Sequence, residues 1–184
     1  MRLFIAIDLP ENLKEKILGV IKNFDKTVAN INFVTDENLH ITLKFLGEVR
    51  EDDVNSIVNI LSNIAKEKEE YNLNVNGFGF FGNPKFIKTL WLGIHEGKNE
   101  TIELMEDLNV KLENVKREDF KPSPHLTVGR VKTADNHSGL INEIRKLKDI
   151  DIGTFHVKEI TLKKSVLTPE GPVYSDIKSF QLGG

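Results

Sequence analysis

Two four-residue stretches, 40–43 and 125–128, carry the residues of this chain best suited to proton transfer, and both read His-x-Thr-x. Each lies in an apolar, β-prone run, where residues i and i+2 point to the same face of a strand. His40 and Thr42 should therefore project together, and so should His125 and Thr127. If the two strands lie side by side, they present two imidazoles and two hydroxyls to one space. That set suits proton transfer at a phosphate ester, because histidine titrates near neutral pH.

Two facing histidines can serve both sides of a phosphorus atom in one in-line step. A neutral imidazole takes a proton from the nucleophile and a protonated one gives a proton to the leaving oxygen, transfers that contribute roughly 10²–10⁴-fold to rate. The threonine hydroxyls can donate hydrogen bonds to the non-bridging oxygens, where negative charge must be held. The scheme needs no metal, and we expect no cofactor. A metal site on His40 and His125 is the weaker alternative, since no third histidine or acid has suitable spacing.

The structural alternative for each motif is an ordinary strand histidine. A lone His-x-Thr is common by chance, but two copies, each in a strand-like run after a turn, favour the catalytic interpretation. The other histidines are interpreted as structural. His95 closes a strand, His137 lies in a polar turn, and His156 alternates within a strand.

Composition limits the classes of function. The chain has 184 residues, with 39% hydrophobic and 29% charged residues and a net charge of −3. This predicts one domain, 1–184, that contacts nucleic acid only locally, at a small substrate or an end. The sequence has no cysteine, which excludes disulfides, thiolate nucleophiles and cysteine zinc sites and fits a reducing cytoplasm. The first apolar run is too short for a signal peptide or a membrane span, so we expect a cytoplasmic protein with no membrane partner.

Hydrophobic periodicity predicts the elements that position the two motifs. Strands are expected at 2–8, 39–48, 71–80, 89–94, 125–132, 154–162 and 173–177, with a short apolar piece at 31–34. Amphipathic helices are expected at 10–26, 51–69, 99–116 and 135–148. Between them lie polar turns at 35–38 and 168–172, a loop rich in glycine and phenylalanine at 78–84, and an extended lead-in at 120–124.

The order of these elements suggests an internal repeat. Each half of the chain supplies a histidine strand followed by a helix, with strands and a helix before it. We therefore predict an α+β, bilobal and pseudo-symmetric fold, in which two mainly antiparallel sheets line a central cleft and helices lie on the outside. Each lobe would contribute one histidine.

With these residues identified, the chain resembles the two-histidine phosphoesterase superfamily over nearly its whole length. It is most similar to the RNA 2′,3′-cyclic phosphodiesterases, also called 2′-5′ RNA ligases. The resemblance is carried by MRLFIAI at 1–7, HITLKFLGE at 40–48, PHLTVGR at 124–130, and the closing residues 165–167 with 171–174. Together these stretches are specific, whereas either tetrapeptide alone would not be.

The resemblance implies hydrolysis of RNA 2′,3′-cyclic phosphate ends to 2′-phosphate ends. It implies that His40 gives a proton to the departing 3′ oxygen and that His125 activates water, an assignment that the residues alone leave open. Run backwards, the reaction would join ends through a 2′-5′ linkage without ATP. The expected partners are RNA ends or nucleotides with a 2′,3′-cyclic phosphate, tRNA fragments among them, and we expect a monomer.

Three further residues are expected to bind substrate: Arg130, Lys44 and Phe81. Arg130 resembles the family's basic residue after the second motif, but its odd offset from His125 would turn it to the other face unless a bulge at Gly129 re-aims it. The alternative is a salt bridge between lobes. Lys44 shares the parity of the first motif and could add positive charge at the cleft, or it could be a solvated lysine at the rim.

Phe78, Phe80 and Phe81 lie in the predicted glycine-rich loop. Exposed aromatic rings there could stack on a base, worth roughly 1–3 kcal/mol each. The favoured alternative is a hydrophobic plug that seals the lobe. Phe45 has the parity of a core residue and is predicted to be buried.

Two other functions remain open. The same chemistry could act on small cyclic nucleotides or on 2′-5′-linked oligonucleotides. Alternatively, the chain could be a non-catalytic module that binds RNA ends, whose phosphate binding would survive loss of either histidine.

Overall fold

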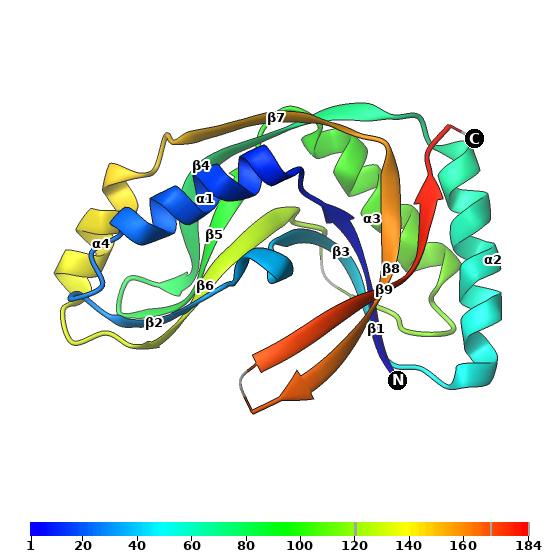
Figure 1. Ribbon diagram of the computed structural model, residues 1–184, viewed down its shortest axis with the longest axis horizontal. Coiled ribbons are helices and arrows are strands. Elements are labelled where there is room, and N and C mark those ends of the chain that lie inside the picture. Colours follow the sequence, from blue (N-terminus) through cyan, green and yellow to red (C-terminus); the bar gives the residue numbers. More distant parts are fainter. Residues whose placement is uncertain (120, 170, 184) are drawn as a thin grey trace.

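A curled antiparallel sheet forms the centre of the molecule (Figure 1). The protein is described from a computed structural model that covers residues 1–119, 121–169 and 171–183. Phe120 of the expected lead-in and Glu170 of the expected turn lie outside the described residues. The strands are β1 (Arg2–Asp8), β2 (Asn30–Phe33), β3 (His40–Glu48), β4 (Tyr71–Asn83), β5 (Phe86–Ile94), β6 (His125–Thr133), β7 (Asp151–Val157), β8 (Glu159–Thr168) and β9 (Gly171–Gln181). Their order across the sheet is β7-β4-β5-β6-β3-β1-β8-β9, and β2 pairs with β6.

Helices cover the outside of this sheet, as predicted. They are α1 (Glu11–Asn23), α2 (Glu51–Glu67), α3 (Lys98–Lys111) and α4 (His137–Lys146), with a 3₁₀ turn η1 (Asp36–Asn38) before β3. α1 and α4 pack on the β7–β4 half of the sheet, and α2 and α3 pack on the half that contains β3, β8 and β9 (Figure 1). The α+β class and the two halves are therefore confirmed. Among the described residues, no helix is long and apolar enough to cross a membrane.

The helices form where their apolar residues recur on one face. In α1, Leu13, Ile17 and Ile21 are buried at a spacing of four, and Pro10 precedes the first turn, where it costs no hydrogen bond. α2 begins with three acidic residues, which interact favourably with the positive end of the helix dipole. α4 is capped by Asn136, whose side-chain oxygen accepts a hydrogen bond from the Gly139 amide at 2.9 Å.

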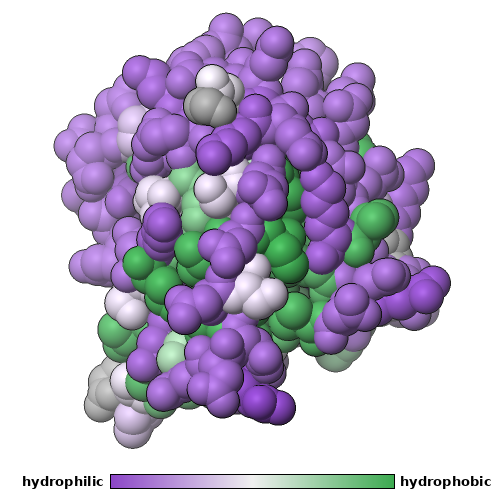
Figure 2. Space-filling model, turned by 90° about the vertical axis from the view of Figure 1, so that its right-hand side faces the viewer, coloured by the Kyte–Doolittle hydropathy of each residue, from purple (hydrophilic) through white to green (hydrophobic). Residues whose placement is uncertain are grey.

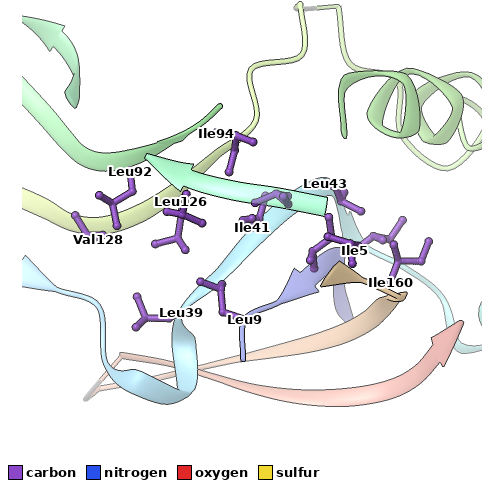
Figure 3. Close-up of a cluster of buried hydrophobic side chains, with 14 of the residues drawn as sticks. Ile5, Leu9, Leu39, Ile41, Leu43, Leu92, Ile94, Leu126, Val128 and Ile160 are labelled. Carbon is purple, nitrogen blue, oxygen red and sulfur yellow. The ribbon is translucent and has the colours of Figure 1, made fainter. Parts of the chain in front are cut away.

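The two histidine strands are anchored by the side chains on their other face. Ile41, Leu43, Leu126 and Val128 are buried in the central cluster that Figure 3 shows. Burying such a side chain fully contributes roughly 1.5–3 kcal/mol. Because side chains alternate along a strand, this anchoring turns the histidines and threonines to the opposite face.

The two sheets expected from the sequence are continuous. β3 and β6 are joined by one antiparallel bridge, between Ile41 and Leu126, while the other neighbouring strands of the path share five or more pairs. The halves of the sheet thus meet at a narrow junction, and both His-x-Thr motifs lie at this junction.

The single strand predicted at 154–162 is wrong. The chain forms β7, which pairs with β4, and then β8, which pairs with β1 and β9 in the other half. Lys158 separates the two strands, and its carbonyl accepts a hydrogen bond from the Leu182 amide. The apolar alternation changes phase here, from Phe155 and Val157 to Ile160 and Leu162, but a change of one residue is also what a bulge within a single strand would give, so periodicity alone could not reveal the crossing.

The loop predicted at 78–84 is also wrong, because β4 continues to Asn83 and pairs with β5. Gly79 has a packing role in this strand rather than a turn role. A Cβ atom at Gly79 would lie 2.5 Å from the ring of Trp91 on β5, so only glycine lets the indole lie against the strand.

In the described part of the chain, exposed large hydrophobic side chains occur in the β8–β9 hairpin and also elsewhere, at Phe45, Phe81, Phe86 and Val110. Figure 2 shows a largely hydrophilic face with hydrophobic residues gathered in its middle and lower part. The β8–β9 hairpin, whose hairpin relation was predicted, exposes Val166, Leu167, Val173 and Ile177.

Candidate active site

A cavity of about 910 Å³ lies where the two halves of the sheet meet. Both predicted motifs line it. The lining includes His40, Thr42, His125, Thr127, Arg130 and Tyr174. The expected convergence of two histidines and two threonines on one space is therefore present in the structure.

The register of β3 and β6 explains how the motifs meet. Ile41 stands opposite Leu126 in an antiparallel pair, so His40 lies across from Thr127 and Thr42 lies across from His125. The two histidines are diagonal neighbours, which lie about 7–8 Å apart, with a somewhat shorter distance between their Cβ atoms. Each imidazole thus has the other motif's threonine beside it, and one phosphate group can lie between the two rings.

His40 is held by aromatic rings and by its own motif. Its ring lies 5.0 Å from Phe4 and 5.3 Å from Tyr174, measured between centroids. Its Nε2 atom is 3.0 Å from the Thr42 hydroxyl. These contacts orient the ring toward the cavity and remove most of its surface from water.

Burial lowers the pKa of His40 to about 4, and the positive charge of Lys163 acts in the same direction. A backbone hydrogen bond to Asn38 and the charge of Asp8 oppose this shift. His40 is therefore neutral at pH 7 in the empty site. A bound anionic phosphate favours the charged imidazolium, so substrate itself promotes the proton that an acid at this position needs.

His125 has a fixed tautomer. Its Nδ1 lies 2.7 Å from the Ser123 carbonyl, which can only accept, so Nδ1 carries the hydrogen and Nε2 is left with a free lone pair. The Phe81 ring meets the imidazole edge-on at 4.7 Å. Burial lowers the pKa of His125, and the charge of Arg130 lowers it further. Both features suit a proton acceptor.

A β-bulge after each motif re-aims the next side chains. In β3, Thr42 pairs with Ala6 and Lys44 with Ile5, which leaves Leu43 as the extra residue. In β6, Thr127 pairs with Trp91 and Gly129 with Leu90, which leaves Val128 as the extra residue. The bulge that Arg130 required is thus present, one position earlier than expected, and Arg130 lines the cavity.

The bulge in β3 makes the prediction for Phe45 wrong. Phe45 was expected in the core, but it is 51% exposed and lines the cavity at the position that corresponds to Arg130. The extra residue in β3 reverses the parity after Thr42, so the face predicted from alternation no longer applies.

Lys44 is not the solvated rim lysine that was the alternative expectation. It is 1% exposed, and its Nζ donates to Asn109 Oδ1 at 2.6 Å and lies 3.7 Å from a carboxylate oxygen of Glu118. Burial lowers the pKa of Lys44, and the Glu118 charge opposes that shift. Although Lys44 borders the cavity, its charge is already paired, and its expected role at substrate stays a prediction.

The three phenylalanines of β4 divide between two roles. Phe78 is 6% exposed and packs as the predicted plug, and Phe80 is partly buried against the core. Phe81 lines the cavity and contacts His125. Two aromatic residues of the site, Phe4 and Tyr174, were not singled out from the sequence, although both lie in stretches that carry the family resemblance.

The remaining histidines do not line the cavity. His156 is hydrogen-bonded to Asn72 at 2.9 Å and to Glu70 at 2.8 Å. His137 begins α4 rather than lying in a turn. In the described part of the chain, no group of three or more histidine or acidic side chains could hold a metal ion.

The low pKa of His40 makes stability depend on pH. In the unfolded chain His40 binds a proton near pH 6.5, whereas in the folded chain it does so only near pH 4. The contribution of His40 to the free energy of unfolding is therefore fully present above pH 6.5 and is lost as pH falls through 4. It amounts to at most about 3 kcal/mol. Urea unfolding between pH 7.5 and 4 should show a smaller loss of stability in His40→Gln than in the wild type. Equal losses would contradict the shift.

Comparison with known protein families divides the chain into two segments, in agreement with the internal repeat. The sequence model of the LigT-like phosphoesterase family matches the chain twice, over residues 7–91 and 92–174, and each match contains one His-x-Thr motif. An RNA 2′,3′-cyclic phosphodiesterase of Methanocaldococcus jannaschii is 41% identical, over 98% of this chain and 100% of its own. One from Methanothermobacter thermautotrophicus is 37% identical, over 99% of each chain.

Solved structures share the fold. The protein TT0787 of Thermus thermophilus superposes with a TM-score of 0.84 at 24% identity, covering 100% of this chain and 99% of its own. E. coli LigT complexed with 3′-AMP superposes with a TM-score of 0.76 at 24% identity, covering 100% and 98%. At these identities the likeness concerns architecture.

Proposed function

The chain belongs to the LigT-like phosphoesterase family, and we propose that it hydrolyses 2′,3′-cyclic phosphate ends of RNA to 2′-phosphate ends. The observation that carries the proposal is the pair of His-x-Thr motifs, which come from separate strands and line one cavity. Relatives of 41% and 37% identity bear the name of this activity.

In the proposed complex the cyclic phosphate lies between the two imidazoles. Thr42 and Thr127 donate hydrogen bonds to its non-bridging oxygens, and Arg130 adds a positive charge. Phe81 and Phe45 border the same cavity and offer apolar surface to the nucleoside. The transition state concentrates negative charge on the oxygens that these donors face, which is the condition for them to accelerate the reaction.

The proposed step moves two protons in opposite directions. His125 Nε2 removes a proton from water as the water oxygen bonds to phosphorus. The bond from phosphorus to the 3′ oxygen breaks, and His40 gives its proton to that oxygen. The product carries a 2′-phosphate and a 3′-hydroxyl, and proton exchange with solvent restores both histidines. If a 5′-hydroxyl attacks phosphorus in place of water, the same step breaks the bond to the 3′ oxygen and yields a 2′-5′ linkage without ATP.

One experiment tests this function. An RNA with a 2′,3′-cyclic phosphate end should be turned over in EDTA, and the product should carry its phosphate on the 2′ oxygen. A 3′-phosphate product would contradict the role of His40 as donor to the 3′ oxygen. Binding of the RNA without turnover would instead support the recognition-module alternative.

Substrate class is separated in the same assay. Cyclic-ended RNAs, tRNA fragments among them, are compared with a free cyclic mononucleotide. The comparison distinguishes an enzyme that acts on RNA ends from one that acts on small cyclic nucleotides. The proposal includes a monomer in the cytoplasm that needs no metal, and these points stay predictions.

A further inference from the structure

The two histidines occupy matching positions in their strands but face different cross-strand partners. In both motifs the strand continues through threonine into a bulge. His40 stands opposite Asp8 of β1, whereas His125 stands opposite Gly93 of β5. Directly opposed residues of an antiparallel pair project from the same face with Cβ atoms about 4.5–5.5 Å apart. A carboxylate therefore flanks one imidazole, and a residue without a side chain flanks the other.

Asp8 belongs to a charged group formed by three adjacent strands. Lys163 of β8 is 8% exposed, and its Nζ lies 2.9 Å from Asp8 Oδ1 and 2.5 Å from Asp176 Oδ1 of β9. One buried cation is thus shared by two carboxylates. The group carries a net charge of −1, and its members do not line the cavity.

The charges around the two rings therefore differ in sign. Around His40, β1 contributes Asp8, β8 contributes Lys163, and β9 contributes Asp176 through Lys163 together with the neutral Tyr174 ring. Around His125, the charged side chain that acts on the ring is Arg130 of its own strand. These charges favour a proton on His40 over one on His125, and they oppose the burial that lowers the pKa of His40 to about 4.

We propose that Asp8, held in place by Lys163, is the positioning residue that favours the protonated form of His40 and so suits it to be the proton donor. The inference rests on the proposed function and deepens it, because the motifs themselves are alike and cannot assign the roles. Asp8 acts through His40 and does not touch substrate. Lys163 moderates the effect, since its positive charge lowers the pKa of His40 whereas the charge of Asp8 raises it.

Two substitutions that break the same ion pair should act in opposite directions. Asp8→Asn removes a negative charge beside His40, so the alkaline limb of the kcat–pH profile should move to lower pH. Lys163→Met removes the positive charge and should move that limb to higher pH. Shifts of about half a unit to one unit are expected, below the one to three units typical of close charges, because Asp8 is partly exposed. At pH 8, kcat of Asp8→Asn should fall about three- to tenfold, with KM little changed.

A purely structural role predicts another result. Loss of the ion pair would then move both profiles in the same direction, or lower kcat equally at all pH values, and either outcome would overturn the proposal. Lys163→Arg, which keeps the charge, should restore the wild-type profile. Thermal unfolding of each variant shows whether it is folded, and Lys163→Gln replaces Lys163→Met if the latter is not.

Two measurements separate this proposal from the proposed function. NMR titration of the His40 ring with inorganic phosphate bound needs no turnover, and it should show a lower pKa in Asp8→Asn and a higher one in Lys163→Met. A cyclic substrate with sulfur at the 3′ position needs little help from an acid, so its hydrolysis should be insensitive to Asp8→Asn. An unchanged His40 titration in both variants would refute the role of Asp8 even if the enzyme hydrolyses RNA ends as proposed.

Discussion

His40→Ala and His125→Ala should each reduce kcat for cyclic phosphate hydrolysis by about 10²–10⁴-fold, which is the contribution of one positioned proton-transfer group. The two imidazoles serve opposite sides of one phosphorus atom, so neither can take over the work of the other. The double variant should be little worse than either single one, because groups that act in one step are not additive. Initial rates on a cyclic-ended RNA measure the effect.

The control for this prediction is His156→Ala. His156 is bound to Glu70 and Asn72 away from the cavity, so its loss should leave kcat within about twofold, on the order of a surface substitution. Circular dichroism should show that all variants are folded. Substantial turnover by either single cavity variant would contradict the two-histidine mechanism.

Arg130→Met should lower kcat/KM about 10²-fold, or about 3 kcal/mol, as expected for a charged donor to a transition-state phosphoryl oxygen. Arg130 reaches the cavity only because the bulge at Val128 turns it there. Arg130→Lys should recover part of the loss, since lysine keeps the charge but not the planar fork of donors. Rates at substrate concentrations below KM measure kcat/KM directly.

Lys132→Met gives a matched comparison on the same strand. Lys132 is exposed and does not line the cavity, so it tests whether general positive charge on β6 attracts RNA. A loss in Lys132→Met equal to that in Arg130→Met would mean that both residues act by long-range attraction. High salt would then reduce the rates of the wild type to the level of the variants.

The sequence was sufficient for the four helices and for the pairing of histidine with threonine in each motif. Apolar residues at spacings of three and four predicted all four helices to within about five residues at each end, because packing on the sheet needs such a stripe. His40 and Thr42 share parity in any extended strand, as do His125 and Thr127. Their convergence could be inferred because two similar half-chains, folded alike, bring equivalent strands together.

Features that depend on a partner strand could not be predicted. A bulge is a mismatch between two strands, so the extra residues Leu43 and Val128 leave no mark in the alternation of their own strand. This is why Phe45 was assigned to the core. Lys44 looked like a surface residue because its partners, Asn109 and Glu118, lie far away in the sequence.

The crossing of the chain at Lys158 could not be predicted for a related reason. β7 and β8 are consecutive and similarly apolar, yet they belong to opposite halves of the sheet. Only the pairing partners distinguish them. Likewise, the ion group of Asp8, Lys163 and Asp176 joins residues that no local pattern connects.

The single bridge between Ile41 and Leu126 leaves β3 and β6 weakly paired at the junction where both histidines lie. The spacing of the two imidazoles is set where the fewest backbone hydrogen bonds hold the halves together. A slight increase in the distance between β3 and β6 separates acid from base while each half keeps its own folded packing. Heating should therefore abolish turnover before either half unfolds. A bound anion that contacts both histidines should raise the temperature at which activity is lost.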